Sequence, residues 1–148
     1  MRLDHLIELR PWRRHSLVLL VGGLVYICVG VIYSTLDELT PRQERVFAIA
    51  LRVFEMDGWG VIFIVVGLLA VASARWPAFS DSWGYGVLTG LSSGWSTVYI
   101  LGYFFGSAPI SNLTVGALWL IIACMWWAIS GLINPEEVIE QVVSNGST

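Results

Sequence analysis

The sequence contains no lysine and few charged residues of any kind. Charged side chains make up 13% of its 148 residues, and the hydrophobic share is 56% with a mean hydropathy of +0.72. Soluble domains carry roughly 25% charged residues. Every basic residue is an arginine, and the net charge is −3. Nucleic acids bind proteins largely through attraction between their phosphates and an excess of positive charge. This chain has a negative net charge, so we expect no nucleic-acid partner.

Side chains that carry chemistry are also scarce. Both histidines precede the first long apolar run, and the cysteines, Cys28 and Cys124, do not form a CxxC pair. The stretch Gly90-Leu-Ser-Ser-Gly94 has the letters of a nucleophile elbow, which requires a preceding strand and a histidine base within reach. Metal-ligand spacings, phosphate loops and dinucleotide fingerprints are missing from the sequence. We therefore expect no enzymatic activity and no cofactor or metal site.

Long uncharged runs dominate the chain. A helix needs about 20 apolar residues to cross a hydrocarbon core of roughly 30 Å. Residues 16–36 suffice, residues 58–74 are near the lower limit, and residues 82–135 have room for two helices and a turn around Pro109. No small-x-small cleavage site follows the first run, so we expect a retained span. The expected fold is an all-α integral membrane protein with four transmembrane helices near residues 16–36, 58–75, 83–106 and 113–133.

A shorter segment between the first two spans carries a helix-start signal. Thr40-Pro-Arg-Gln43 has the residues of a capping box with proline at the first helical position. It predicts an amphipathic helix over about 41–56, lying in the membrane interface or packed on the span ends. The chain then divides into a basic N-terminal segment (1–15), a four-span membrane domain (16–134) and an acidic tail (135–148).

Arginine placement predicts orientation, and tryptophan placement agrees with the span limits. Arg10, Arg13 and Arg14 lie just before the first span, so the positive-inside rule places both termini in the cytoplasm. Tryptophan is favoured at the headgroup level, where its ring is in the apolar layer and its N–H reaches water. The expected interface anchors are Trp12, Trp59, Trp76 and Trp83.

Glycines recur every four residues along the third expected span. Small residues let helix backbones approach closely, and hydroxyl groups can form hydrogen bonds across the contact. This side of the helix is interpreted as a packing face within one bundle or, alternatively, as a contact between copies or the lining of a wet passage. The glycines are Gly86, Gly90, Gly94, Gly102 and Gly106, and the polar face comprises Thr89, Ser92, Ser93, Ser96 and Thr97.

The first two expected spans contain similar short stretches of sequence. The stretch from Gly23 to Gly30 is similar to the stretch from Gly60 to Gly67, with glycine at both ends of each. Glycines seven residues apart return to one helix face. We interpret both pairs as places where helix backbones approach closely.

The stretch RPWRRHSLVLLVGGLVY, from Arg10 to Tyr26, resembles small multi-span membrane proteins encoded by phages of actinobacteria. Some of those proteins are holin-like. A holin oligomerises in the host membrane and permeabilises it at lysis. The resemblance implies the cytoplasmic membrane of a bacterial host. Four spans depart from the commoner one to three, and no family site residues carry over.

Three functions remain after these exclusions. The first is a phage-type, non-enzymatic membrane protein that permeabilises the bilayer in a holin-like way through helix association. The second is an accessory or superinfection-exclusion protein that binds another membrane protein. The third is a carrier for an uncharged or lipid-like molecule, without ion coupling, because no aspartate, glutamate, lysine, arginine or histidine lies in the interior of any expected span. The expected partners are the lipid bilayer and either further copies or another membrane protein.

Overall fold

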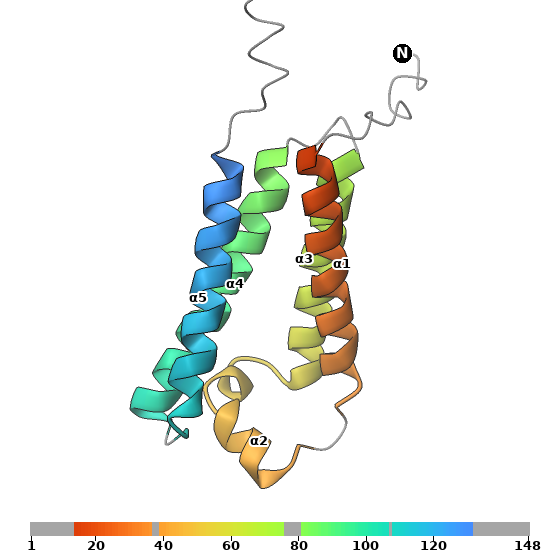
Figure 1. The fold of residues 1–148 in the computed structure, drawn as a ribbon. Helices are drawn as coiled ribbons and strands as arrows, with labels where there is room; N and C mark the ends of the chain where they lie inside the picture. Colours follow the sequence, from red (N-terminus) through yellow and green to blue (C-terminus); the bar gives the residue numbers. More distant parts are fainter. Residues whose placement is uncertain (1–13, 37–38, 76–80, 107, 132–148) are drawn as a thin grey trace, which may run out of the picture.

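The computed structural model describes residues 14–36, 39–75, 81–106 and 108–131, and within these ranges it is helical without strands (Figure 1). Two long helical pairs stand side by side, and a short helix lies at one end of them. The elements in chain order are α1 (Arg14–Ser34), α2 (Pro41–Val46), the 3₁₀ helix η2 (Ala50–Arg52), α3 (Met56–Arg75), α4 (Asp81–Phe105) and α5 (Ser111–Ser130).

Three of the described helices are long and apolar enough to cross a membrane. They are the Ser16–Ser34 part of α1, the whole of α3 and the whole of α5. This indicates a membrane protein, but it falls short of the four spans that we expected. Helix α4 is longer, at 25 residues, yet it is missing from this group. Its many glycine, serine, threonine and tyrosine residues lower its hydropathy.

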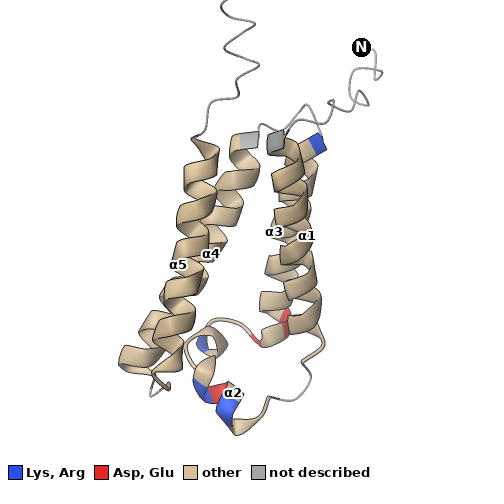
Figure 2. Ribbon diagram, in the orientation of Figure 1, with Lys and Arg blue, Asp and Glu red and all other residues tan. Residues whose placement is uncertain are grey.

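Charged side chains of the described residues gather at the two ends of the molecule (Figure 2). Most lie in the segment containing α2 and η2 or at the start of α3, where Asp57 is the second residue. Arg75 is the last residue of α3 at the opposite end. Between these ends the helices carry no charge in the described part of the chain, which suits a hydrocarbon environment.

Glycine contacts hold α1 against α3. A Cβ atom added at Gly23 would lie 2.6 Å from the carbonyl oxygen of Gly67, and one added at Gly30 would lie 2.6 Å from that of Gly60. Gly23 therefore faces Gly67, and Gly30 faces Gly60. These are the points at which the antiparallel backbones of α1 and α3 approach most closely. The similar stretches Gly23–Gly30 and Gly60–Gly67 thus pack on each other, as expected if their glycines permit close approach of the helix backbones.

Helix α4 pairs with α5 across a short turn. The hydroxyl of Ser96 donates to the carbonyl of Gly116 at 2.7 Å. A Cβ atom at Gly116 would lie 2.8 Å from Cγ1 of Ile100, so this glycine also marks a close approach. The break between Phe105 and Ser111 falls where the proline, serine and asparagine residues predicted a turn.

The segment between α1 and α3 packs on the bundle end instead of forming one amphipathic helix. The capping box is confirmed: Gln43 N–H donates to the Thr40 hydroxyl, and Thr40 N–H donates to the Gln43 side chain. The expected helix over 41–56 is wrong in its extent, because α2 ends at Val46 and only η2 follows. The side chain of Asn112 donates a hydrogen bond to the Val46 carbonyl, and the indole N–H of Trp59 donates one to the Ala50 carbonyl. Both hydrogen bonds attach the segment to the long helices.

Candidate functional site

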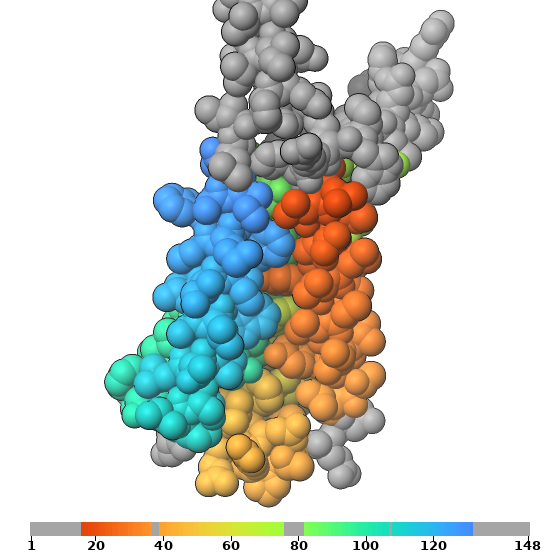
Figure 3. All heavy atoms as spheres, in the orientation of Figure 1, coloured from red at the N-terminus to blue at the C-terminus, as the bar shows by residue number. Residues whose placement is uncertain are grey.

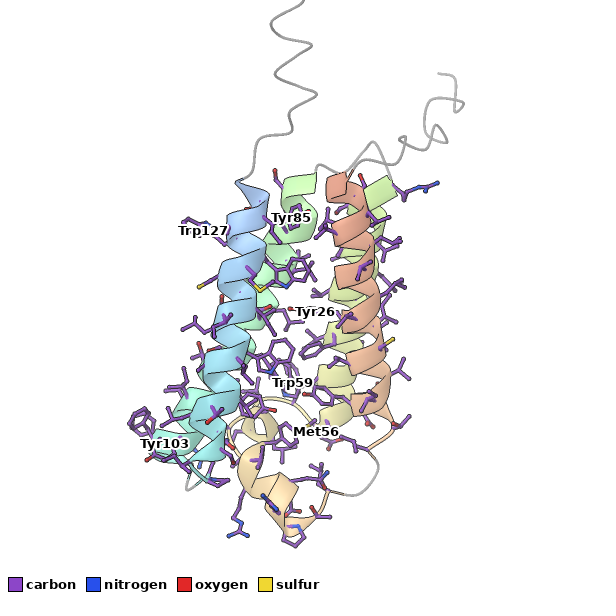
Figure 4. All side chains as sticks on the ribbon, viewed as in Figure 1. Tyr26, Met56, Trp59, Tyr85, Tyr103 and Trp127 are labelled. Carbon is purple, nitrogen blue, oxygen red and sulfur yellow. The ribbon has the colours of Figure 1, made fainter. Side chains whose placement is uncertain are left out.

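Aromatic rings fill the space between the two helical pairs. Trp95 on α4 is 1% exposed. The centroid of its ring lies 5.3 Å from that of Phe63, 5.6 Å from that of Tyr33 and 4.8 Å from that of Trp59. Figure 4 shows Tyr26, Trp59 and Tyr85 directed between the pairs, and Tyr103 and Trp127 directed outward. The gap between the ribbons in Figure 1 is therefore occupied by packed rings. The indole N–H of Trp95 is buried there without a hydrogen-bond partner among the described residues.

A small polar network lies deep in this aromatic layer. The indole N–H of Trp126 donates to the hydroxyl of Tyr26 at 3.3 Å, and the Tyr26 and Ser92 hydroxyls are hydrogen-bonded to each other. The Ser92 hydroxyl also bonds the Leu88 carbonyl at 2.6 Å. This network joins α1, α4 and α5. Neither Tyr26 nor Trp126 was predicted as a site residue, and their only signal in the sequence is that both are amphipathic aromatic residues within apolar runs.

Three of the expected packing glycines face away from the bundle. Gly86, Gly90 and Gly94, called the α4 ladder from here on, are exposed, and a Cβ atom added at any of them meets no atom of the described chain within 4 Å. The expectation that this side packs within one bundle is therefore wrong for these positions. The opposite side of α4 makes the internal contacts instead, through Tyr85, Leu88, Ser92, Trp95 and Tyr99, spaced three or four residues apart, and through Ser96 next to Trp95; all six are buried.

The remaining two predicted glycines, Gly102 near the end of α4 and Gly106 just after it, lie next to the α4–α5 turn. Gly102 is buried, and a Cβ atom there would lie 3.3 Å from Nδ2 of Asn112. A Cβ atom at Gly106 would lie 2.8 Å from the carbonyl oxygen of Gly102. Gly106 thus makes room for the chain where α4 ends, and neither residue extends the ladder.

The expected polar face divides between the inside and the outside of the bundle. Ser92 and Ser96 are fully buried and hydrogen-bonded, so they line no passage in this chain. Thr97 is exposed, and its hydroxyl donates to the Ser93 carbonyl at 2.9 Å. Such back-bonding satisfies a hydroxyl within its own helix. Thr89 and Ser93 are half-buried, and with Thr97 they lie beside the α4 ladder.

The tryptophans expected to be interface anchors differ in their surroundings. Trp83 is 69% exposed in the first turn of α4, where a headgroup contact is available. Trp59 instead donates its indole N–H to the Ala50 carbonyl at 3.0 Å, and its ring packs at a tilt against that of Trp95, so it is a packing residue. Arg14 is the first residue of α1. Trp12, Trp76, Arg10 and Arg13 lie outside the described residues.

The described residues contain no cluster of three or more histidine, cysteine, aspartate or glutamate side chains that could hold a metal ion. Cys28 on α1 and Cys124 on α5 are free and exposed on the outer surface. The described surface also includes the α4 ladder and an apolar groove between α1 and α5. No family model, no curated protein and no solved structure matches this chain.

Proposed function

We propose that this chain is a non-enzymatic membrane protein that spans the bilayer four times and works by association through the α4 ladder. One observation carries the proposal: no described residue covers the ladder, whereas the close-approach glycines of α1 and α3 are all covered by a facing backbone. In lipid, where no hydrophobic effect draws helices together, stripes of small residues are favoured contact surfaces because they permit backbone approach.

The position and length of α4 support a fourth span. It lies alongside α5, which is itself apolar enough to cross a membrane (Figure 1). Its 25 residues would reach about 37 Å at 1.5 Å per residue, more than a hydrocarbon core of roughly 30 Å. Its hydroxyl groups Ser92, Ser96 and Thr97 are hydrogen-bonded, which lowers their cost in lipid.

A second copy of the chain is the partner that this surface suits best. Two α4 helices related by a two-fold axis would place each ladder on the other, as in an isologous contact. Thr89, Ser93 and Thr97 flank the ladder, so hydroxyl hydrogen bonds between copies would add to the backbone contact.

The biological effect that we propose for this assembly is holin-like permeabilisation of a bacterial host membrane, in line with the phage-type resemblance. Aromatic rings fill the interior of one bundle, so a leak would run between copies beside the α4 ladder. A threshold follows from this arrangement, because leakage would require enough inserted copies to associate.

A second candidate function is a phage accessory or exclusion protein that binds a different membrane protein through the same ladder. The burial of Ser92 and Ser96 favours it, because two of the five predicted hydroxyls are absent from the exposed face. A face with fewer hydroxyl groups is a poorer lining for water, although it remains a good surface for another helix.

The first test is association. Cross-linking in native membranes should yield dimers or larger species for the wild type, and Gly90→Leu should reduce them at least about tenfold by holding the backbones apart. Ala117→Leu is the matched control, because it adds the same side chain to an exposed position on α5. Equal cross-linking of both variants would exclude the α4 ladder as the contact.

The second test separates the two functions. Dye-reported membrane potential should collapse above a threshold amount of inserted wild-type protein and persist in cells holding the same amount of Gly90→Leu. Cells that stay energised while abundant wild-type protein is cross-linked would reject permeabilisation and leave the accessory function.

A further inference from the structure

An apolar groove of about 400 Å³ lies between α1 and α5. These helices belong to different pairs and meet along the seam between the orange-red and blue surfaces in Figure 3. Val21 and Val25 of α1 line one wall, and Ile122 and Met125 of α5 line the other. Both helices are apolar enough to span a membrane, so the medium at this groove is hydrocarbon.

Tryptophan and glycine shape the groove and leave it without a free polar atom. Trp126 lies across Gly22, where a Cβ atom would be 2.6 Å from its Cη2 atom. The indole N–H of Trp126 and the Tyr26 hydroxyl are bonded to each other, and the Tyr26 hydroxyl is also bonded to Ser92. The polar atoms of these lining residues are thus satisfied inside the protein, and the groove presents carbon atoms to its occupant.

The charge at one end of the groove indicates what kind of molecule enters it. Leu17 lines the groove one turn after Arg14, which begins α1, and Arg10 and Arg13 precede it in the sequence. From Leu17 to Val25 the groove follows α1 for about 12 Å, which is the depth of roughly one leaflet. Clustered arginine next to a membrane attracts anionic lipid headgroups.

We propose that this groove binds one acyl chain of an anionic phospholipid, whose headgroup lies at the level of Arg14. The chain enters from the leaflet on the arginine-rich side. The proposal rests on the proposed membrane placement of α1 and α5, but not on association through α4. The two can therefore fail separately.

The test titrates the full-length protein in detergent with phosphatidylglycerol or phosphatidylcholine and counts retained lipids by native mass spectrometry. The wild type should retain one phosphatidylglycerol per chain, in preference to phosphatidylcholine. Val21→Trp fills the groove and should lower this retention about tenfold. Leu24→Trp is the matched control, because Leu24 is an exposed α1 residue outside the groove lining, and it should retain the lipid.

The headgroup contribution is tested by Arg14→Gln, which should lower the preference for phosphatidylglycerol about fivefold, the effect of one basic residue near a surface. Gly90→Leu should retain the lipid. Equal retention by Val21→Trp and Leu24→Trp would overturn the groove as the site, and so would loss of lipid in Gly90→Leu. No preference for phosphatidylglycerol in the wild type would overturn the anionic headgroup. Helical circular dichroism of each variant checks that it is folded.

Discussion

At the scale of single residues, side-chain hydrogen bonds to backbone carbonyls fasten the α2 segment (residues 41–55) to the bundle. Asn112 is 1% exposed, and its Nδ2 atom donates to the Val46 carbonyl at 3.0 Å. The carbonyl at the end of a helix has no partner within that helix, so another group must supply one. Asn112 does this from the first turn of α5, 66 residues away in the sequence.

Asn112→Leu should therefore destabilise the protein. The Val46 carbonyl would lose its side-chain donor in a poorly hydrated place, and an unpaired buried polar group costs about 1–3 kcal/mol. Thermal unfolding in detergent, followed by circular dichroism, measures the change. Thr114→Leu, at an exposed position two residues further along α5 and on the other side of the helix, is the control and should unfold close to the wild type. Identical melting of Asn112→Leu and the wild type would show that this bond does not hold the α2 segment.

At the scale of elements, glycine occurs in two different settings, at close contacts between helices and on an open helix surface. Gly23 and Gly30 of α1 and Gly60 and Gly67 of α3 touch the facing backbone, and the glycines in the α4 ladder touch nothing in the described chain. Between the helical pairs, large aromatic rings pack against one another, and a pair such as Phe63 and Trp95, with centroids 5.3 Å apart, contributes about 0.5–1.5 kcal/mol beyond burial. The α1–α3 contact is thus a backbone contact, and the contact between pairs is an aromatic one.

Leucine substitutions at these two kinds of glycine should have opposite effects on stability. A Cβ atom at Gly67 would lie 2.5 Å from the Gly23 carbonyl oxygen, so Gly67→Leu forces α1 and α3 apart and should cost about 1–3 kcal/mol or more. Gly90→Leu meets open space and should leave the monomer unchanged or up to about 1 kcal/mol more stable, because glycine is a poor helix former. Melting in detergent at a dilution where the wild type is monomeric measures both. A larger loss for Gly90→Leu than for Gly67→Leu would contradict this assignment.

At the scale of the whole molecule, the arrangement of the helices predicts which loops share a side of the membrane. The α2 segment and the α4–α5 turn lie at the same end of the bundle (Figure 1), and Asn112 connects them. The start of α4 and the end of α3, with Arg75, lie at the other end. If α4 spans the bilayer, these two ends face opposite compartments.

Cysteine labelling in intact cells tests this layout, in a background in which Cys28 and Cys124 are replaced by alanine. Thr40→Cys and Ile110→Cys should react with an impermeant thiol reagent, and Ser82→Cys should react only after the membrane is permeabilised. The arginine-rich N-terminus sets this direction. Labelling of Ser82 alone would reverse the orientation. Equal labelling of Ser82→Cys and Ile110→Cys would show that α4 does not cross.

The features that the sequence determined by itself are those set by neighbouring residues. Uncharged run length predicted helices within a few residues of α1, α3, α4 and α5, because a chain in hydrocarbon must satisfy its backbone groups within the segment. The capping box placed the start of α2, and Pro109 with its polar neighbours marked the turn before α5. Each of these signals acts over a few residues, so no distant contact was needed to predict it.

Only the tertiary structure decided which side of each helix faces inward. The hydroxyl residues of α4 lie on adjoining sides of one helix, so the sequence could not separate the buried Ser92 and Ser96 from the exposed Thr97. It could not show that the α4 ladder turns outward or that Asn112 forms a hydrogen bond with the Val46 carbonyl at the end of α2. The contact between Tyr26 and Trp126 joins residues 100 positions apart. Such contacts depend on how the helices pack against one another, and that packing is a property of the whole chain.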